Sequence, residues 1–150
     1  MGIKIIGTNK RAGFDYSLKE TFEAGISLQG TEVKVLREGK VNLTEAFVIV
    51  DEKMEVWAYN VLIPQYSFGN INNHQEGRIK KLLLNKAEII RIYKEMKTQQ
   101  LALIVTKIYF KDSRIKLEFA LGKGKKLHDK READKEKDIK KKLQRGNYED

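Results

Sequence analysis

Few side chains in this sequence are of the kinds that carry out catalysis. His74 and His128 are its two histidines, and cysteine is absent. A thiol nucleophile, a Cys-ligated zinc and a His-x-x-x-His metal pair are therefore excluded. Asp51 and Glu52 are adjacent carboxylates, but they lie between two strand-like runs, where a turn role is favoured over metal binding. The sequence predicts no catalytic residue, no metal site and no cofactor.

Basic side chains are the more informative set. The 150 residues include 30 Lys and Arg against 21 Asp and Glu, a net charge of +9. Each basic group alone could be ordinary solvated surface, but five on one domain, with aromatic side chains available, favour binding to nucleic acid. Such binding would depend strongly on salt. The five groups are Lys10 with Arg11; Lys34, Arg37 and Lys40; Arg78, Lys80 and Lys81; Lys123, Lys125 and Lys126; and Lys130 with Arg131.

The positive charge divides between two parts of the chain. Residues 1–122 hold 19 basic and 14 acidic side chains, and residues 123–150 hold 11 and 7, so the net charges are +5 and +4. The second part has too few apolar side chains to offset the entropy of ordering its backbone, about 1–2 kcal/mol per residue. We expect a folded domain over 1–122 and a basic tail over 123–150 that is disordered when free.

Charge order in the tail predicts a helix that forms on an anionic partner. Glu136 precedes Lys140 by four residues and Asp138 precedes Lys142 by four, and each pair would favour a helix by about 0.2–0.5 kcal/mol. A tail that serves only solubility is the alternative interpretation.

The elements that would position these residues are mostly strands. Residues 46–50 and 54–59 form a predicted hairpin, and residues 103–110 and 115–121 form a second one. Residues 22–28 alternate apolar and polar side chains and predict a further strand.

Two segments have helical patterns. Residues 86–97 place apolar side chains at helical spacing and predict a helix. Residues 31–38 fit either a strand or a short helix, and we favour a helix with Thr31 as N-cap and Gly39 just beyond its end. Short strands with few helices predict a small antiparallel barrel or sandwich. An OB-type barrel is the leading candidate, because it needs about 100 residues and presents a nucleic-acid-binding face. An SH3-like barrel stays open.

Taken in order, the motifs resemble one family, the SsrA-binding protein or small protein B, which partners transfer-messenger RNA. One such motif would be weak, whereas the set in family order and spacing is highly specific. The matching pieces are Asn9–Ala12, Asp15–Tyr16, Phe22–Ile26, Gly30–Lys34, Leu36–Arg37, Gly39–Asn42, Lys81–Leu84, Tyr109 with Lys111, Lys123–Lys126 and His128–Glu132.

The resemblance implies an OB-fold barrel with flanking helices and a closed antiparallel sheet. It implies a non-enzymatic adaptor of trans-translation that binds the D-loop and elbow of the tRNA-like domain of transfer-messenger RNA and delivers it to stalled ribosomes. A carboxylate such as Glu23 could accept a hydrogen bond from a base amino group. The residues implied to contact this RNA are Asn9, Lys10, Arg11, Glu23, Arg37, Arg78, Lys81, Leu83, Lys116 and Lys123.

The resemblance also implies that the tail enters the empty mRNA channel near the decoding centre of the ribosome, becomes helical there and contacts ribosomal RNA. His128 matches a position where its ring would stack on an rRNA base. The implied tail residues are Gly124, Lys125, Lys126, His128, Asp129, Lys130, Arg131, Lys137, Lys140, Lys141 and Lys142.

Some positions depart from the family pattern. Gly13 and Phe14 stand where a basic residue and His are common, the 74–80 loop lacks the usual Asp-Pro, and Lys80 replaces an Arg, which loses the bidentate fork. A structural rRNA-binding protein and a metal-dependent RNA-cleaving enzyme remain alternatives.

The longest apolar runs are about five residues against the 20 that a membrane span needs. We therefore expect a soluble, cytoplasmic monomer.

Overall fold

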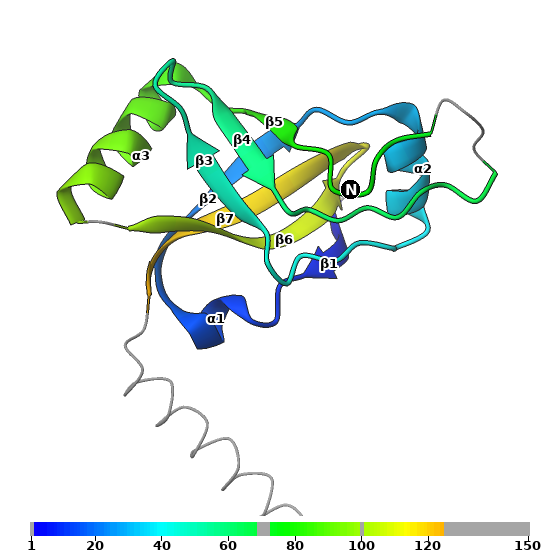
Figure 1. Cartoon of the computed structure of the whole chain (residues 1–150), viewed down its shortest axis with the longest axis horizontal. Coiled ribbons are helices and arrows are strands. Elements are labelled where there is room, and N and C mark those ends of the chain that lie inside the picture. Colours follow the sequence, from blue (N-terminus) through cyan, green and yellow to red (C-terminus); the bar gives the residue numbers. More distant parts are fainter. Residues whose placement is uncertain (1, 69–72, 100, 125–150) are drawn as a thin grey trace, which may run out of the picture.

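The computed structural model describes residues 2–68, 73–99 and 101–124 (Figure 1). The tail residues from Lys125 onward lie outside the described residues. The elements in chain order are β1 Ile3–Thr8, α1 Ala12–Asp15, β2 Tyr16–Ile26, α2 Gly30–Arg37, β3 Phe47–Val50, β4 Val56–Tyr59, β5 Lys80–Leu83, α3 Lys86–Gln99, β6 Ala102–Lys111 and β7 Arg114–Gly124.

The seven strands form one antiparallel sheet that closes on itself. Its order is β1-β6-β3-β4-β5-β2-β7, and β7 pairs back onto β6, so six strands make a ring and β1 extends β6 on the outside. The predicted mainly-β fold with flanking helices is confirmed. In Figure 1, α3 and α2 lie at opposite ends of this ring.

Neighbouring strands of the ring differ in how many residues they pair. β6 and β7 pair along almost their full lengths. β3 and β6 pair only at Phe47 with Ile104 and at Val48 with Leu103. β2 and β5 likewise pair only near their ends, through Gly25 and Ile26. The single sheet therefore has two parts, β1-β6-β7-β2 and β3-β4-β5, that are joined by two short junctions.

The core fills the inside of the ring. Leu117, Phe119 and Leu121 of β7 are buried, as the alternation in that strand predicts, and Phe22 packs on Phe119 with ring centroids 5.6 Å apart. Ile92 of α3 is fully buried and closes one end. Most core side chains are aliphatic, so burial of apolar surface supplies the main driving force for this fold.

Both predicted hairpins are confirmed. In the β3–β4 hairpin Val50 pairs with Val56. The Asp51 carboxylate accepts hydrogen bonds from the backbone N–H of Glu55 and Lys53 and from Nε1 of Trp57, at 2.9, 3.0 and 2.9 Å. These bonds, that from Glu55 first, hold the pKa of Asp51 below its ordinary value. Asp51 thus has the turn role that its position predicts.

The helix predictions are confirmed, with one correction at a cap. α3 covers the predicted 86–97 and continues to Gln99. α2 covers the segment that fitted either helix or strand, and Gly39 follows it with φ +79°. The N-cap is Gln29, not Thr31, because Glu32 accepts the Gln29 N–H at 2.7 Å in a capping box.

Other elements were not predicted or have different bounds. β1, α1 and β5 were not expected, and β2 begins at Tyr16 rather than near residue 22. At the other end, Lys123 pairs with Ser17 and Gly124 with Tyr16. The last strand therefore includes Lys123 and Gly124, which the sequence placed in the tail, because the early start of β2 offers them a partner strand.

Candidate nucleic-acid interface

The outer face of β6, β7, β2 and β5 brings two predicted site residues, Leu83 and Lys116, into one row. Tyr109 pairs with Lys116, Lys116 with Gly25, and Gly25 with Leu83, so the four residues lie side by side across four strands. Their chain neighbours Ile108, Leu117, Ala24 and Leu82 are buried in the core. Because side chains alternate along a strand, the row lies on the side opposite these core residues, although Tyr109 itself is only 3% exposed.

Glu23 lies next to this row and is held in place by its neighbours. Its carboxylate accepts a hydrogen bond from the Tyr109 hydroxyl at 2.5 Å, and Lys111 Nζ lies 3.3 Å away. The Tyr109 hydrogen bond, opposed by partial burial and assisted by Lys111, lowers the pKa of Glu23. Burial and Glu23 in turn raise the pKa of Tyr109. Glu23 is thus an oriented, ionised acceptor, the kind of group that can bind a base amino group.

A hollow of about 400 Å³ lies beside the row, at the end of the barrel where α2 meets the β6–β7 hairpin. Arg37, Arg114 and Lys116 line it, and none of the three makes an ion pair within the described part of the chain. Arg114 was not predicted as a site residue, since its segment had the pattern of a hairpin turn. The signal available was its place two residues before Lys116 on the same strand face.

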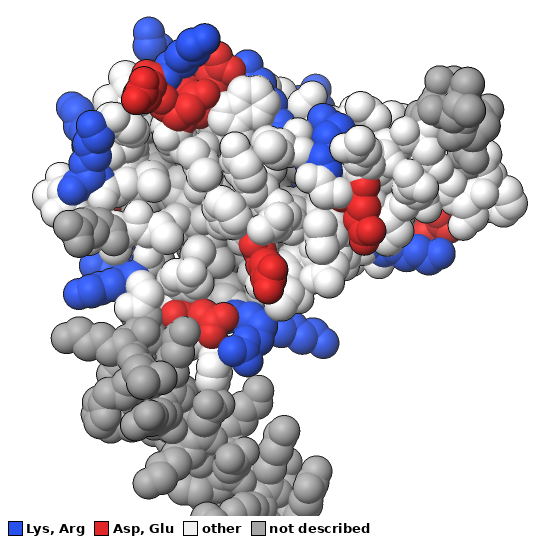
Figure 2. Space-filling model, viewed as in Figure 1, with Lys and Arg blue, Asp and Glu red and all other residues white. Residues whose placement is uncertain are grey.

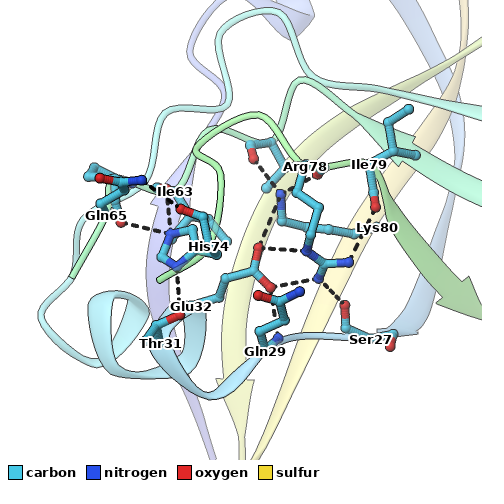
Figure 3. Close-up of polar contacts among 12 residues, drawn as sticks. Ser27, Gln29, Thr31, Glu32, Ile63, Gln65, His74, Arg78, Ile79 and Lys80 are labelled. Carbon is cyan, nitrogen blue, oxygen red and sulfur yellow. Dashed lines mark hydrogen bonds and ion pairs between the residues drawn. The ribbon is translucent and has the colours of Figure 1, made fainter. Parts of the chain in front are cut away.

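Beneath this end of the barrel, a buried ionic network ties α2 to the segment leading into β5 (Figure 3). Glu32 is fully buried, and its carboxylate accepts hydrogen bonds from Arg78 Nη2 at 2.6 Å and Nε at 3.2 Å. Lys80 is also fully buried, with Nζ 3.7 Å from Glu32. Its ammonium donates to the carbonyls of Arg78 and Val61 at 2.6 and 2.9 Å.

The two buried charges have shifted pKa values for physical reasons that oppose each other. Burial alone would raise the pKa of Glu32, but hydrogen bonds from Arg78 and the Gln29 backbone, with the charge of Lys80, bring the pKa below its ordinary value. Burial lowers the pKa of Lys80, and the Glu32 charge resists that change. The network fixes α2, which carries Arg37, relative to β5, which carries Leu83.

His74, the one described histidine, belongs to the same structural framework and not to a reactive site. It is 2% exposed, with Nδ1 2.8 Å from the Thr31 hydroxyl and Nε2 2.9 Å from the carbonyls of Ile63 and Pro64 (Figure 3). These contacts hold the loop before β5 against α2.

A second group of predicted residues lies at the opposite end of β2. Asn9 is buried, donates to the Val105 carbonyl at 2.9 Å and accepts the Arg11 N–H at 3.0 Å. Arg11 pairs with Asp15 at 3.1 Å and lies 4.2 Å from the centroid of the Phe14 ring. Phe14, which departs from the family pattern, thus helps to orient Arg11.

The two groups are well separated. Lys123 lies beside Ser17 near the first group, whereas Gly25 and Lys116 lie near the other end of β2. Nine residues of strand between Tyr16 and Gly25 span at most roughly 30 Å. An RNA that contacts both groups must therefore lie along the length of the barrel.

The structure separates the predicted residues by what their side chains already contact. Asn9, Arg11, Arg78 and Lys81 are engaged within the protein, Lys81 through Glu55 at 3.4 Å. Lys80, expected in a surface group, is inside the barrel. Lys10, Arg37 and Lys123 are exposed and Lys116 is half-buried, and none of these four makes an ion pair among the described residues. Leu83 is exposed and offers an apolar contact. The RNA contacts of all these residues stay predictions.

The predicted tail residues other than Gly124 lie outside the described residues. They are Lys125, Lys126, His128, Asp129, Lys130, Arg131, Lys137, Lys140, Lys141 and Lys142.

Positive charge by itself does not mark the interface. On the face seen in Figure 2, most Lys and Arg side chains lie near the periphery, several beside Asp or Glu, and the centre carries few charges. Within 2–68, 73–99 and 101–124, no three His, Asp or Glu side chains gather as metal ligands would. No helix in those ranges is long and apolar enough to cross a membrane.

Known proteins resemble this chain over most of its length. A family model described as SmpB protein matches residues 6–149. An SsrA-binding protein of Sinorhizobium fredii is 49% identical over 90% of this chain and 85% of its own. One of Saccharopolyspora erythraea is 47% identical over 96% of this chain and 90% of its own. A solved structure described as "tmRNA-SmpB: a journey to the center of the bacterial ribosome" matches with TM-score 0.69 and 41% identity, covering 84% of this chain and 92% of that one.

Proposed function

This chain belongs to the SmpB family, and we propose that it is the RNA-binding adaptor of trans-translation, binding transfer-messenger RNA through its tRNA-like domain and delivering it to stalled ribosomes. The observation that carries this proposal is the agreement between family membership over nearly the whole chain and an outer barrel face whose cations have no ion pair among the described residues and lie beside an oriented carboxylate.

The chemistry of that face suits RNA. Arg37, Lys116 and Lys123 would neutralise phosphates, Leu83 would pack against a base or ribose, and Glu23 would accept a hydrogen bond from a base edge. Asn9, Arg11 and Arg78 would act mainly by holding the backbone and their neighbours in place, since their polar groups already have protein partners. The protein would work in the cytoplasm, without catalysing a reaction itself.

The basic tail would have a separate role on the ribosome. We propose that residues after Gly124 enter the decoding centre and the empty mRNA channel and fold into a helix there, with lysines and arginines facing rRNA phosphates. This division of labour follows the division of charge, +5 on residues 1–122 and +4 on the remainder.

A gel shift tests the first part of this function. The full chain should bind transfer-messenger RNA and its isolated tRNA-like fragment far more tightly than an RNA hairpin of equal length and charge. Equal affinity for the fragment and the hairpin would overturn the proposal.

A truncation after Gly124 tests the second part, because it keeps β7 intact. The truncated protein should retain most of its affinity for the tRNA-like fragment and lose tagging of stalled nascent chains in a reconstituted translation system. Loss of RNA binding together with tagging would refute the division of labour.

A further inference from the structure

The 400 Å³ hollow at the end of β2 has a composition that fits a particular ligand. Its apolar surface comes from Ile26, Leu28 and Val33 together with Leu83 and Ile115. Its charged lining residues are Arg37, Arg114 and Lys116, and no acidic residue lines it. Hollows of about 300–1,000 Å³ with an apolar wall and a few polar groups are typical small-molecule sites.

The three cations are available to a ligand. Elsewhere in the described chain many basic side chains face a carboxylate, as Lys107 faces Glu118 and Lys81 faces Glu55. Arg37, Arg114 and Lys116 have no such ion pair there, although they come from two different elements and converge on one hollow. No acid lines the hollow, and the nearby Glu23, whose pKa the charge of Lys116 helps to lower, is already bound by Tyr109 and Lys111. Three like charges arranged in this way favour an anion between them.

Gly25 gives the hollow its depth. It lies between Leu83 and Lys116 in the outward-facing row, so every other residue there would place a side chain in the space. Its backbone does not require glycine, because its φ is not positive. A Cβ added at this position would lie 3.4 Å from Leu83 Cβ, an ordinary contact. The absence of a side chain is therefore not explained by the fold.

We propose that the hollow over Gly25 binds one unstacked nucleotide of the bound RNA, with its base against Gly25 and Leu83 and its phosphate facing Arg37, Arg114 and Lys116. Single-stranded RNA bases that are splayed out of the stack are commonly recognised by pockets of this kind. The base fits the apolar wall, and the phosphate fits the cations. This inference rests on the proposed function, and it adds Gly25 and Arg114 to the binding site.

The substitution Gly25→Ala tests the proposal, because its methyl group enters the hollow while the strand accepts it. Its affinity for the tRNA-like fragment should fall at least tenfold, with the melting temperature unchanged. Gly30→Ala is the matched control, since a Cβ there meets no atom within 4 Å and lies at the start of α2. That control should bind RNA as the parent chain does.

A direct measurement uses nucleoside 5′-monophosphates and NMR spectra of the full chain. The amide signals of Gly25 and Leu83 should shift with a dissociation constant in the millimolar range. Ribose 5-phosphate and the unphosphorylated nucleoside should each shift them less, and Gly25→Ala should abolish the response. Signals that do not move with any monophosphate would overturn the proposal.

The outcomes separate the two proposals. If Gly25→Ala binds the fragment with unchanged affinity, the nucleotide site is wrong and the proposed function stands. If the parent chain does not prefer the fragment over an unrelated hairpin, the proposed function fails, and the monophosphate titration still decides whether the hollow binds a nucleotide.

Should Gly25→Ala lower the melting temperature, Arg114→Gln replaces it, because Arg114 is an exposed residue without an ion pair in the described chain. Arg114→Gln should weaken fragment binding severalfold, and unchanged binding would refute the site.

Discussion

Replacing Glu32 by glutamine should destabilise the fold far more than the same change at an exposed ion pair. Glu32 and Lys80 are each fully buried, and the Lys80 ammonium otherwise faces only two carbonyl oxygens. The Glu32→Gln variant keeps the size of the side chain but leaves the buried ammonium without a counter-charge.

The expected loss is about 3 kcal/mol, the lower end of the 3–5 kcal/mol typical of removing one partner from a buried ion pair. The lower end applies because the Arg78 side chain is 27% exposed and can recover part of its interaction from water. Glu55→Gln is the matched control. Its pair with Lys81 is solvent-exposed at 3.4 Å, and such pairs contribute about 0–1 kcal/mol.

Urea unfolding followed by the fluorescence of Trp57, the single tryptophan, measures both variants. With a slope near 2 kcal/mol per molar urea, the Glu32→Gln midpoint should fall by about 1.5 M. The double variant Glu32→Gln with Lys80→Met should regain most of this loss, since it removes the stranded charge. Midpoints of the two single variants within experimental error of each other would refute the reasoning, as would a double variant no more stable than Glu32→Gln.

Acid pH adds a second readout of the same pair. The pKa of Glu32 is lowered in the folded state, so its ionised form stabilises the fold fully above its ordinary value of 4.5. That stabilisation is lost as the pH falls below 4.5 and through the folded-state pKa. The stability difference between the parent chain and Glu32→Gln should therefore narrow below pH 4.5. A difference that stays constant would show that charge is not the cause.

Three further outcomes follow from the structure. Arg37→Gln should reduce the slope of log affinity for the tRNA-like fragment against log salt by about 1, with Lys53→Gln on the β3–β4 turn as a control that leaves the slope unchanged. Tyr109→Phe should raise the pKa of Glu23 toward its ordinary value in an NMR titration and cost about 1 kcal/mol, because Glu23 loses its strongest hydrogen bond; an unchanged pKa would contradict this. Gly39→Ala should cost about 1 kcal/mol in thermal unfolding, since φ there is +79°, and an unaltered melting temperature would argue against the strained position.

Elements with a strong local pattern could be predicted from the sequence. The hairpins at β3–β4 and β6–β7 have strand-forming apolar runs on either side of a polar turn, with alternation in β7, and α3 has apolar residues at helical spacing. Each of these signals lies within one continuous stretch of chain, the longest being residues 103–121. The missed strand β5 begins Lys80-Lys81, which resembles an exposed loop. Its inward Lys80 is tolerated only because Glu32, 48 residues earlier, supplies the counter-charge.

The candidate site could be predicted in composition and only partly in arrangement. Residue types and family resemblance identify Glu23, Leu83 and Lys116, and the strand register brings them to one face. The same reasoning could not tell a cation available to RNA from one already paired. Arg78 has the charge of a phosphate contact but is bound to Glu32, whereas Arg114 is unpaired within the described chain and was missed. Pairing depends on long-range neighbours that a single sequence does not specify.

The two short junctions of the barrel have a consequence for its motion. Local opening is easiest where few backbone hydrogen bonds join neighbouring strands. The amide hydrogens of Ile26 and Val48 should therefore exchange with deuterium sooner than those in the centre of β6 and β7. Gly25 and Leu83 face each other across one junction, and the proposed nucleotide would touch both. Bound RNA would then hold β2 and β5 together at this junction. Bound transfer-messenger RNA should slow exchange at this junction while leaving exchange at the β3–β6 junction unchanged.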